Sequence, residues 1–191
     1  MSFDFETKIL AKLINEKTIV INPKMQKILT ERGFGEIEND VLILDSFETL
    51  YLLYNNKLEL KKVNKNIIFD ELLQKYILKN DDILIRFLLY RDLRTKGYTV
   101  KDGFGFGSDF RVYERGTYGS KDARFVIFAF NEGTQQKIGK LYKNIIEITK
   151  MGKEPIVAVV ERRGEIIYYK INKMNFSENK PELQMKDFEF N

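Results

Sequence analysis

The segment Gly103–Gly116, with the sequence GFGFGSDFRVYERG, indicates the fold of the second half of this 191-residue chain. It begins with Gly103, Gly105 and Gly107, which favour a tight turn because glycine adopts backbone conformations that other residues rarely reach. The segment lacks the Lys-Ser/Thr pair of a phosphate-binding loop, and no helical pattern follows it. Asp109–Tyr113 then alternates polar and apolar residues, which predicts a half-buried strand after the turn.

The residues on either side of this segment show helical and strand patterns. Before it, Asp82–Lys96 repeats apolar residues at helical spacing, and Gly97 ends the expected helix. The other elements expected in this half are helices at Phe69–Lys79 and Thr134–Met151 and strands at Tyr98–Lys101, Arg124–Phe130, Pro155–Val160 and Ile166–Ile171. This α-β-β-β-α-β-β order predicts a mixed sheet flanked by helices.

The residues before this half predict a smaller unit of mixed α/β structure. The expected strands are Thr18–Asn22, Val41–Leu44 and an edge strand at Lys57–Lys61, and the expected helices are Pro23–Arg32 and Asp45–Tyr54. Glu48 follows Asp45 by three residues, which is the spacing of a capping box. The fold class is therefore α/β in the broad α+β sense. Val63–Asn66 marks the expected boundary between an N-terminal domain at 1–66 and a C-terminal domain at 67–171, followed by a tail at 172–191.

Two residue types are absent, because the chain contains neither cysteine nor histidine. Disulfides, thiolate metal sites, the common zinc sites, cysteine nucleophiles and a histidine general acid are therefore excluded. A magnesium site built from carboxylates stays open. The formal net charge of +4 is compatible with nucleic-acid binding without establishing it.

The chain has no apolar run of the roughly 18 residues that a membrane span needs. Its first residues, MSFDFETKIL, lack the basic and apolar pattern of a secretory signal. We therefore expect a cytoplasmic protein with no membrane partner.

Three stretches resemble the archaeal tRNA-splicing endonucleases. Tyr90–Gly116 is similar to the catalytic domain of that family, in which a helix ending DLR-x-x-GY-x-V leads into FG-x-DF-x-VY. Ile156–Tyr169, IVAVVERRGEIIYY, resembles the family ending LAVVD-x-x-GD-x-x-YY, and Leu42–Leu60 resembles its N-terminal EALYLLE-x-GKL element. The likeness covers most of residues 18 to 171, and it implies a restriction-endonuclease-like C-terminal sheet.

The resemblance implies an RNA-cleaving site of tyrosine, histidine and lysine that uses no metal or other cofactor. Tyr113 matches the tyrosine and Lys153 the lysine, although Gly152 stands where the family usually has arginine. The histidine should come three residues before the aromatic residue of the next strand, and Asp122 occupies that position.

Asp122 changes what the site can do. A free aspartic acid has a pKa of about 3.9 and carries no proton to donate at pH 7. Its negative charge also repels a phosphate, and loss of general acid catalysis typically costs about 10²- to 10⁴-fold in rate. The sequence therefore favours a subunit released from catalysis over one in which Asp122 is an unusual acid.

Further residues are candidates for binding RNA and a second subunit. We expect RNA contacts from Arg94, Lys101, Arg111, Arg115 and Lys121, with Tyr98, Phe104 and Tyr118 interleaved for stacking on bases. In the resembling family the last strand pairs across a subunit interface, and an acidic loop docks into another subunit. The corresponding candidates are Ile167 and Tyr169 on the apolar last strand and Glu161 and Glu165 on the loop before it. Strand pairing is the better supported contact, because Arg162 and Arg163 dilute the acidic loop.

Three functions follow from these observations. The first is a structural subunit of a hetero-oligomeric tRNA-splicing endonuclease, which pairs with a homologous catalytic subunit and positions precursor tRNA with bulge-helix-bulge-like sites. The second is a self-sufficient RNA nuclease that uses Tyr113 and Lys153 with Asp122 as a perturbed acid or a metal ligand. The third is an RNA-binding module without cleavage. Magnesium dependence separates the second from the first.

Overall fold

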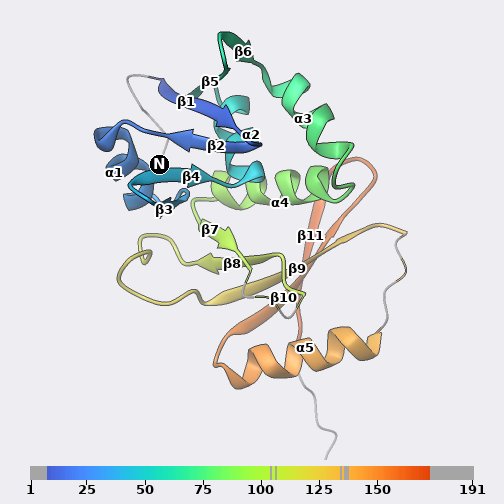
Figure 1. Cartoon of the computed structure of the whole chain (residues 1–191). Coiled ribbons are helices and arrows are strands. Elements are labelled where there is room, and N and C mark those ends of the chain that lie inside the picture. The colour runs from blue at the N-terminus through green and yellow to red at the C-terminus, as the bar shows by residue number, and fades with distance from the viewer. Residues whose placement is uncertain (1–7, 104, 106, 134, 136–137, 173–191) are drawn as a thin grey trace, which may run out of the picture.

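The computed structural model describes residues 8–103, 105, 107–133, 135 and 138–172. Phe104 and the predicted tail beyond residue 172 lie outside this range. The described part contains two sheets, one from each half of the chain, with helix α4 (Ile83–Thr95) between them (Figure 1). The mixed α/β fold class is confirmed, as is the C-terminal sheet flanked by helices.

The first sheet has the strand order β3-β4-β2-β1-β5-β6. Its strands are β1 (Ile9–Ile14), β2 (Lys17–Val20), β3 (Glu36–Glu38), β4 (Val41–Leu44), β5 (Leu58–Lys62) and β6 (Lys65–Ile67). Strands β1 and β5 are parallel, and all other neighbours in the sheet are antiparallel. The prediction of an edge strand at Lys57–Lys61 is wrong, because β5 lies between β1 and β6. Its polar residues reflect an exposed sheet face, which gives the same alternation as an edge.

Helices α1 (Pro23–Glu31) and α2 (Ser46–Tyr54) complete the N-terminal half. The capping box predicted at Asp45 and Glu48 is present, and Glu48 Oε2 accepts a hydrogen bond from the backbone N–H of Asp45 at 2.9 Å. The hairpin β5–β6 runs across residue 66. Division of the chain into 1–66, 67–171 and 172–191 stays a prediction.

The second sheet has the order β11-β10-β9-β8-β7. Its strands are β7 (Thr99–Asp102), β8 (Phe110–Tyr113), β9 (Phe125–Asn131), β10 (Glu154–Val160) and β11 (Ile166–Lys170), and its half also holds helices α3 (Phe69–Ile77) and α5 (Ile138–Lys150). Strands β9 and β10 are parallel, and the other neighbours are antiparallel. The α-β-β-β-α-β-β order expected from the sequence is confirmed.

Helices α4 and α5 cover opposite faces of the second sheet (Figure 1). Ile127 and Ala158 belong to the core on the α4 side, whereas their sequence neighbours Val126 and Val157 pack with Ile148 of α5. This alternation follows from the period of two along a strand. The middle of β10 is therefore packed on both faces of the sheet.

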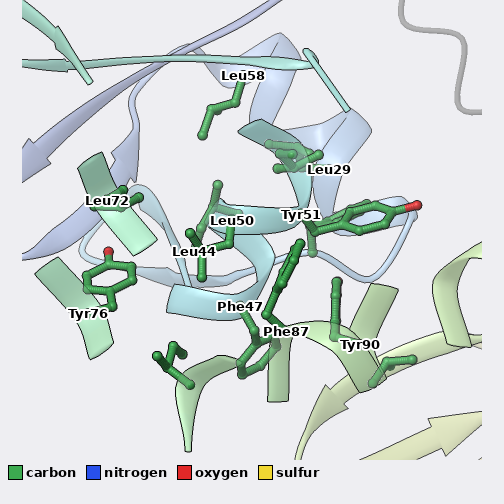
Figure 2. Packing of buried hydrophobic residues seen from close by; sticks show 14 of the residues in the cluster. Leu29, Leu44, Phe47, Leu50, Tyr51, Leu58, Leu72, Tyr76, Phe87 and Tyr90 are labelled. Carbon is green, nitrogen blue, oxygen red and sulfur yellow. The ribbon is translucent and has the colours of Figure 1, made fainter. Parts of the chain in front are cut away.

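A single apolar core joins the two halves (Figure 2). It extends from the first sheet through Leu50 and Phe47 of α2 to Tyr90 of α4 and Phe110 of β8. The ring centroids of Phe47 and Tyr90 are 4.9 Å apart, and those of Phe47 and Phe110 are 5.0 Å apart in an edge-to-face arrangement. The N-terminal half is thus packed firmly beside the strands that carry the candidate site.

Candidate functional site

The end of β8 and the starts of β9 and β10 lie together at one end of the second sheet. The backbone N–H of Arg124 donates to the carbonyl oxygen of Val112 at 3.0 Å, which joins the end of β8 to the start of β9. The backbone N–H of Glu154 donates to the carbonyl oxygen of Arg124 at 2.9 Å, which joins the start of β10 to the same point. This arrangement brings together the segments that carry Tyr113, Asp122 and Lys153.

Tyr113 and Asp122 line the same depression in the surface. It has a volume of about 560 Å³, and its other lining residues are Tyr118, Gly119, Ser120 and Lys121. The ring of Tyr113 meets that of Tyr118 edge to face, with centroids 5.0 Å apart and an interplanar angle of 86°. The sequence grouped Tyr118 with stacking residues, and the structure places it beside Tyr113.

Lys153 reaches the same region from the loop before β10. Gly152 has a φ of 70°, a conformation that suits glycine where the chain turns from α5 into the strand. The Nζ atom of Lys153 donates a hydrogen bond to the carbonyl oxygen of Ala123 at 2.9 Å. The lysine is therefore tied to the residue that follows Asp122.

Backbone hydrogen bonds give the loop from Glu114 to Lys121 a defined shape. The N–H of Thr117 donates to Glu114 O at 3.1 Å, and the N–H groups of Ser120 and Lys121 both donate to Thr117 O, at 3.0 and 2.9 Å. The hydroxyl groups of Thr117 and Ser120 duplicate two of these contacts. Tyr118 lies inside the second of these turns, so its backbone is held in place.

Ion pairs surround the strand starts. Arg124 pairs with Glu114, and its Nε lies 2.7 Å from Glu154 Oε1. Lys170 on β11 approaches the other oxygen of Glu154 at 2.6 Å. Hydrogen bonds from Lys170 and then Arg124 lower the pKa of Glu154. These contacts connect the loop after β8 with β9, β10 and β11.

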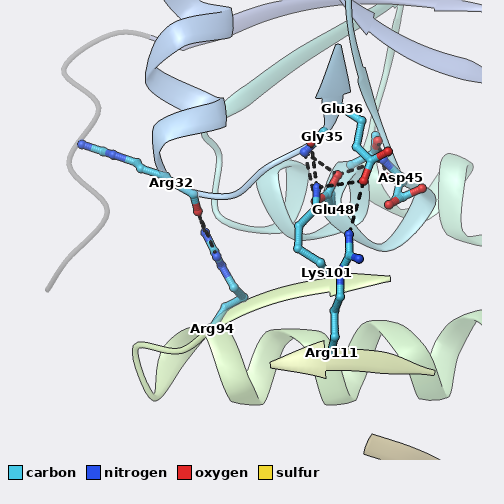
Figure 3. Close-up of polar contacts among 9 residues, drawn as sticks. Arg32, Gly35, Glu36, Asp45, Glu48, Arg94, Lys101 and Arg111 are labelled. Carbon is cyan, nitrogen blue, oxygen red and sulfur yellow. Dashed lines mark hydrogen bonds and ion pairs between the residues drawn. The ribbon is translucent and has the colours of Figure 1, made fainter. Parts of the chain in front are cut away.

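Two of the residues expected to contact RNA lie inside the protein (Figure 3). Arg94 and Lys101 are each only 3% exposed. Both terminal nitrogens of Arg94 donate to Arg32 O at 3.1 Å, and Lys101 Nζ donates to Gly35 O at 2.7 Å. Their expected role at an RNA surface is therefore withdrawn, because both side chains instead connect the C-terminal half to backbone carbonyls of the N-terminal half.

The other basic candidates are at least partly accessible. Lys121 is exposed at the rim of the depression. Arg115 is exposed, and its guanidinium carbon lies 5.4 Å from the centre of the Tyr98 ring. Arg111 is partly buried, and its Nη2 lies 3.6 Å from Glu36 Oε1. RNA contact by these three residues stays a prediction.

Glu48 is a buried carboxylate that the sequence indicated only as a helix cap. It is fully buried, and both of its oxygens accept from the N–H of Gly35, at 3.1 and 3.0 Å (Figure 3). Lys101 Nζ lies 3.9 Å from Glu48 Oε1. Burial raises the pKa of Glu48 to about 7, even though the nearby charge of Lys101 acts in the opposite direction.

The last strand, β11, forms an edge of the second sheet. Ile167 and Tyr169 are exposed on it, at 39% and 49% of their surface. On the other side, the hydroxyl of Tyr168 donates to Asp92 Oδ2 of α4 at 2.6 Å. Glu161 and Glu165 close the turn before this strand, since Glu161 N donates to Glu165 O at 2.9 Å. The interface role of these residues stays a prediction.

Among the residues that the structure describes, no group of three or more histidine, cysteine or acidic side chains is placed to hold a metal ion. The helices in this part of the chain are also too short or too polar to cross a membrane.

Comparison with known proteins adds a second kind of observation. The sequence matches the family models of the tRNA intron endonuclease N-terminal domain over residues 9–73 and the catalytic C-terminal domain over residues 83–168. Proteins called tRNA-splicing endonuclease are similar along most of their length. That of Methanococcus maripaludis is 34% identical over 162 residues, which are 83% of this chain and 90% of the relative. Those of Methanococcus vannielii and Thermococcus onnurineus are each 31% identical, over 83% and 80% of this chain and 90% and 88% of the relatives.

Proposed function

Because this chain belongs to the tRNA intron endonuclease family, with a role in the cleavage of tRNA introns, we propose that it is the structural subunit of a hetero-oligomeric enzyme. In this proposal a homologous subunit with a complete catalytic set cuts the RNA. The present chain supports assembly and holds precursor tRNA at bulge-helix-bulge-like sites.

The observation that carries the proposal is the residue at position 122. In the reaction that the resemblance implies, the 2′-hydroxyl attacks the adjacent phosphorus and the bond to the 5′ oxygen breaks. The products are a 2′,3′-cyclic phosphate and a 5′-hydroxyl, so a general acid must give the leaving oxygen a proton. Asp122 is exposed to solvent, and its side chain stands where the family has the imidazole that serves as this acid.

The remaining family positions would still serve to bind RNA. Tyr113 lines the depression, and Lys153, which is not one of the lining residues, would add a positive charge from its position at Ala123 O. A phosphate held there would meet the exposed amine of Lys121 as well. The acidic side chain of Asp122 would repel a phosphate placed directly beside it. We therefore expect the phosphate to lie nearer Lys121, in a position that permits binding but not cleavage.

The proposed subunit contact uses the β11 edge. Ile167 and Tyr169 present apolar surface on a strand that has a neighbour on one side only among the described residues, and a strand of a homologous subunit would cover both the side chains and the free side of β11. Glu161 and Glu165 would lie at the end of that contact.

The test is cleavage of an intron-containing precursor tRNA in EDTA, with this chain alone and with a histidine-bearing homologue from the same genome. Product only in the mixture supports the structural subunit, provided that the homologue alone is inactive or slower. Product from this chain alone in EDTA contradicts the structural-subunit proposal and favours Asp122 as the acid. In that case Asp122→Asn should abolish cleavage. Cleavage that requires added magnesium favours the metal-dependent alternative. RNA binding with no product in any mixture favours the binding module.

A further inference from the structure

A second depression adjoins the one that contains Tyr113 and Asp122. It has a volume of about 570 Å³ and is lined by Thr30, Glu31, Gly116, Tyr118, Gly119 and Ser120. Tyr118, Gly119 and Ser120 also line the first depression. The two therefore share a wall, and together they lead from Tyr113 to the end of helix α1 in the N-terminal half.

Tyr118 is the aromatic residue of that wall. Its ring lies against the backbone at Gly33, where an added Cβ atom would approach Tyr118 Cε1 and Cζ to 3.3 Å. The edge-to-face contact with Tyr113 holds the ring from another direction. The side chain is half-buried, so it is supported by protein and still borders both depressions.

The loop fixes this ring before any ligand arrives. Gly116 and Gly119, on either side of Tyr118, have φ values of 73° and 83°, which let two hydrogen-bonded turns follow one another. A ring held in this way loses little conformational entropy when a ligand packs on it.

The charges around Tyr118 differ between the two ends. At the end that holds Tyr113, Lys121 adds a positive charge beside the acidic Asp122. The end formed by α1 has the acidic Glu31 and no basic residue among the described residues that line it. Partial burial raises the pKa of Tyr118, so the side chain stays uncharged and does not repel a phosphate. A positive charge suits a phosphate, and an aromatic wall with a carboxylate beyond it suits the face and amino groups of a base.

We propose that the paired depressions form a nucleotide subsite in which an unpaired RNA base packs on Tyr118 while its phosphate lies toward Lys121. Residues at the end of α1 would contact the outer edge of that base. This inference rests on the proposed function, because it places the base next to the phosphate region near Tyr113. It adds a positioning residue outside the three family positions and gives the N-terminal half a direct part in RNA recognition.

The test measures RNA binding by this chain, alone and reconstituted with the histidine-bearing homologue. The probe is a bulge-helix-bulge RNA in which 2-aminopurine replaces an unpaired bulge base, and a fully paired duplex is the reference. Tyr118→Phe keeps the ring, whereas Tyr118→Leu keeps bulk against Gly33 but removes the aromatic face. Tyr142→Ala is the control, since it removes an exposed tyrosine of α5, an element that contributes to neither depression.

Stacking contributes about 1–3 kcal/mol per base, so we expect Tyr118→Leu to weaken binding by about 5- to 150-fold. Tyr118→Phe and Tyr142→Ala should bind as the wild type does. The stacking signature in 2-aminopurine fluorescence should disappear only in Tyr118→Leu.

Unchanged affinity and fluorescence in Tyr118→Leu would overturn the subsite and leave the proposed function standing. A wild-type protein that does not prefer bulged RNA over duplex in either form would overturn both. If Tyr118→Leu does not fold, Tyr118→Phe with a photoreactive 4-thiouridine at the bulge decides the question. A crosslink in the loop 116–121 supports the subsite, and crosslinks confined to other segments contradict it.

Discussion

Lys101 and Glu48 face each other inside the protein, with Nζ and Oε1 3.9 Å apart, although they come from opposite halves of the chain. Lys101 lies on β7 and Glu48 in the first turn of α2. Both also bind Gly35, since Lys101 donates to its carbonyl oxygen and Glu48 accepts from its N–H. One buried charge pair therefore fixes a glycine of the N-terminal half against the sheet that carries the candidate site.

Replacement of Lys101 with methionine should strongly destabilise the protein. The change leaves Glu48 buried without its opposite charge and removes the hydrogen bond to Gly35 O. Loss of one partner of a buried ion pair typically costs about 3–5 kcal/mol. Urea denaturation at about pH 8, above the pKa of Glu48, should show this loss in the free energy of unfolding. Lys17→Met is the matched control, because Lys17 pairs with Glu38 on the surface, and it should change stability by less than about 1 kcal/mol.

The same site predicts how stability depends on pH. The pKa of Glu48 is raised from 4.5 to about 7 by burial, so the folded state holds a proton that the unfolded state has released. The contribution of Glu48 to stability is therefore complete below about pH 4.5 and is lost as pH rises toward 7. Glu48→Gln cannot ionise and should remove this part of the pH dependence.

The measurement compares wild type and Glu48→Gln by urea denaturation between pH 4 and 8, because other titrating groups then cancel in the difference. Glu38→Gln, a surface change, serves as control. A constant stability difference between wild type and Glu48→Gln across this range would contradict the prediction, because it would show that the pKa of Glu48 is the same in the folded and unfolded states.

A third prediction concerns the contact between the two halves at Gly33. Gly33 and Gly116 both have a φ of 73°, but an added Cβ at Gly33 would lie 2.3 Å from Thr99 Cγ2, whereas nothing lies within 4 Å at Gly116. Both alanine variants bear the backbone cost of about 1–2 kcal/mol, and only Gly33→Ala adds a steric clash. Gly33→Ala should therefore lower the thermal midpoint more.

Thr99→Ser removes the clashing methyl group and keeps the hydroxyl, so it should recover part of the loss in Gly33→Ala. A double-mutant cycle of these two changes measures the recovery. Equal losses in Gly33→Ala and Gly116→Ala, or no coupling in the cycle, would show that Thr99 moves away without cost.

The sequence predicts the second sheet better than the first for a physical reason. Apolar and polar residues alternate along β8, whereas β9 is almost entirely apolar. Helices followed by glycine come before β7 and before β10, so the strands are easy to delimit. Strand β1 was missed because Leu10 and Ile14 are apolar on its exposed face, which hides the period of two. Strands β3 and β6 were missed because three residues give too short a pattern.

The candidate site, like the first sheet, is only partly predictable from local sequence patterns. The family resemblance assigns Tyr113 and Asp122 to one site, and in the structure both line one depression. The burial of Arg94 and Lys101 was not predictable, because their partners are backbone carbonyls 62 and 66 residues away in the sequence. A basic residue that binds a distant carbonyl has the same local pattern as one that faces solvent.

The last prediction restores the missing acid. Asp122→His places an imidazole in the depression beside Tyr113 and removes the charge that opposes a phosphate. General acid catalysis typically contributes about 10²- to 10⁴-fold, so we expect this variant to cleave precursor tRNA measurably in EDTA at pH 6 to 7, where imidazole exchanges its proton. Asp122→Asn removes the same charge without supplying a proton and is the matched control. Cleavage by Asp122→His alone would show that the loss of the acid is the main reason for an inactive chain. Equal inactivity of both variants, with normal folding and RNA binding, would contradict this prediction and show that the missing acid alone does not account for an inactive chain.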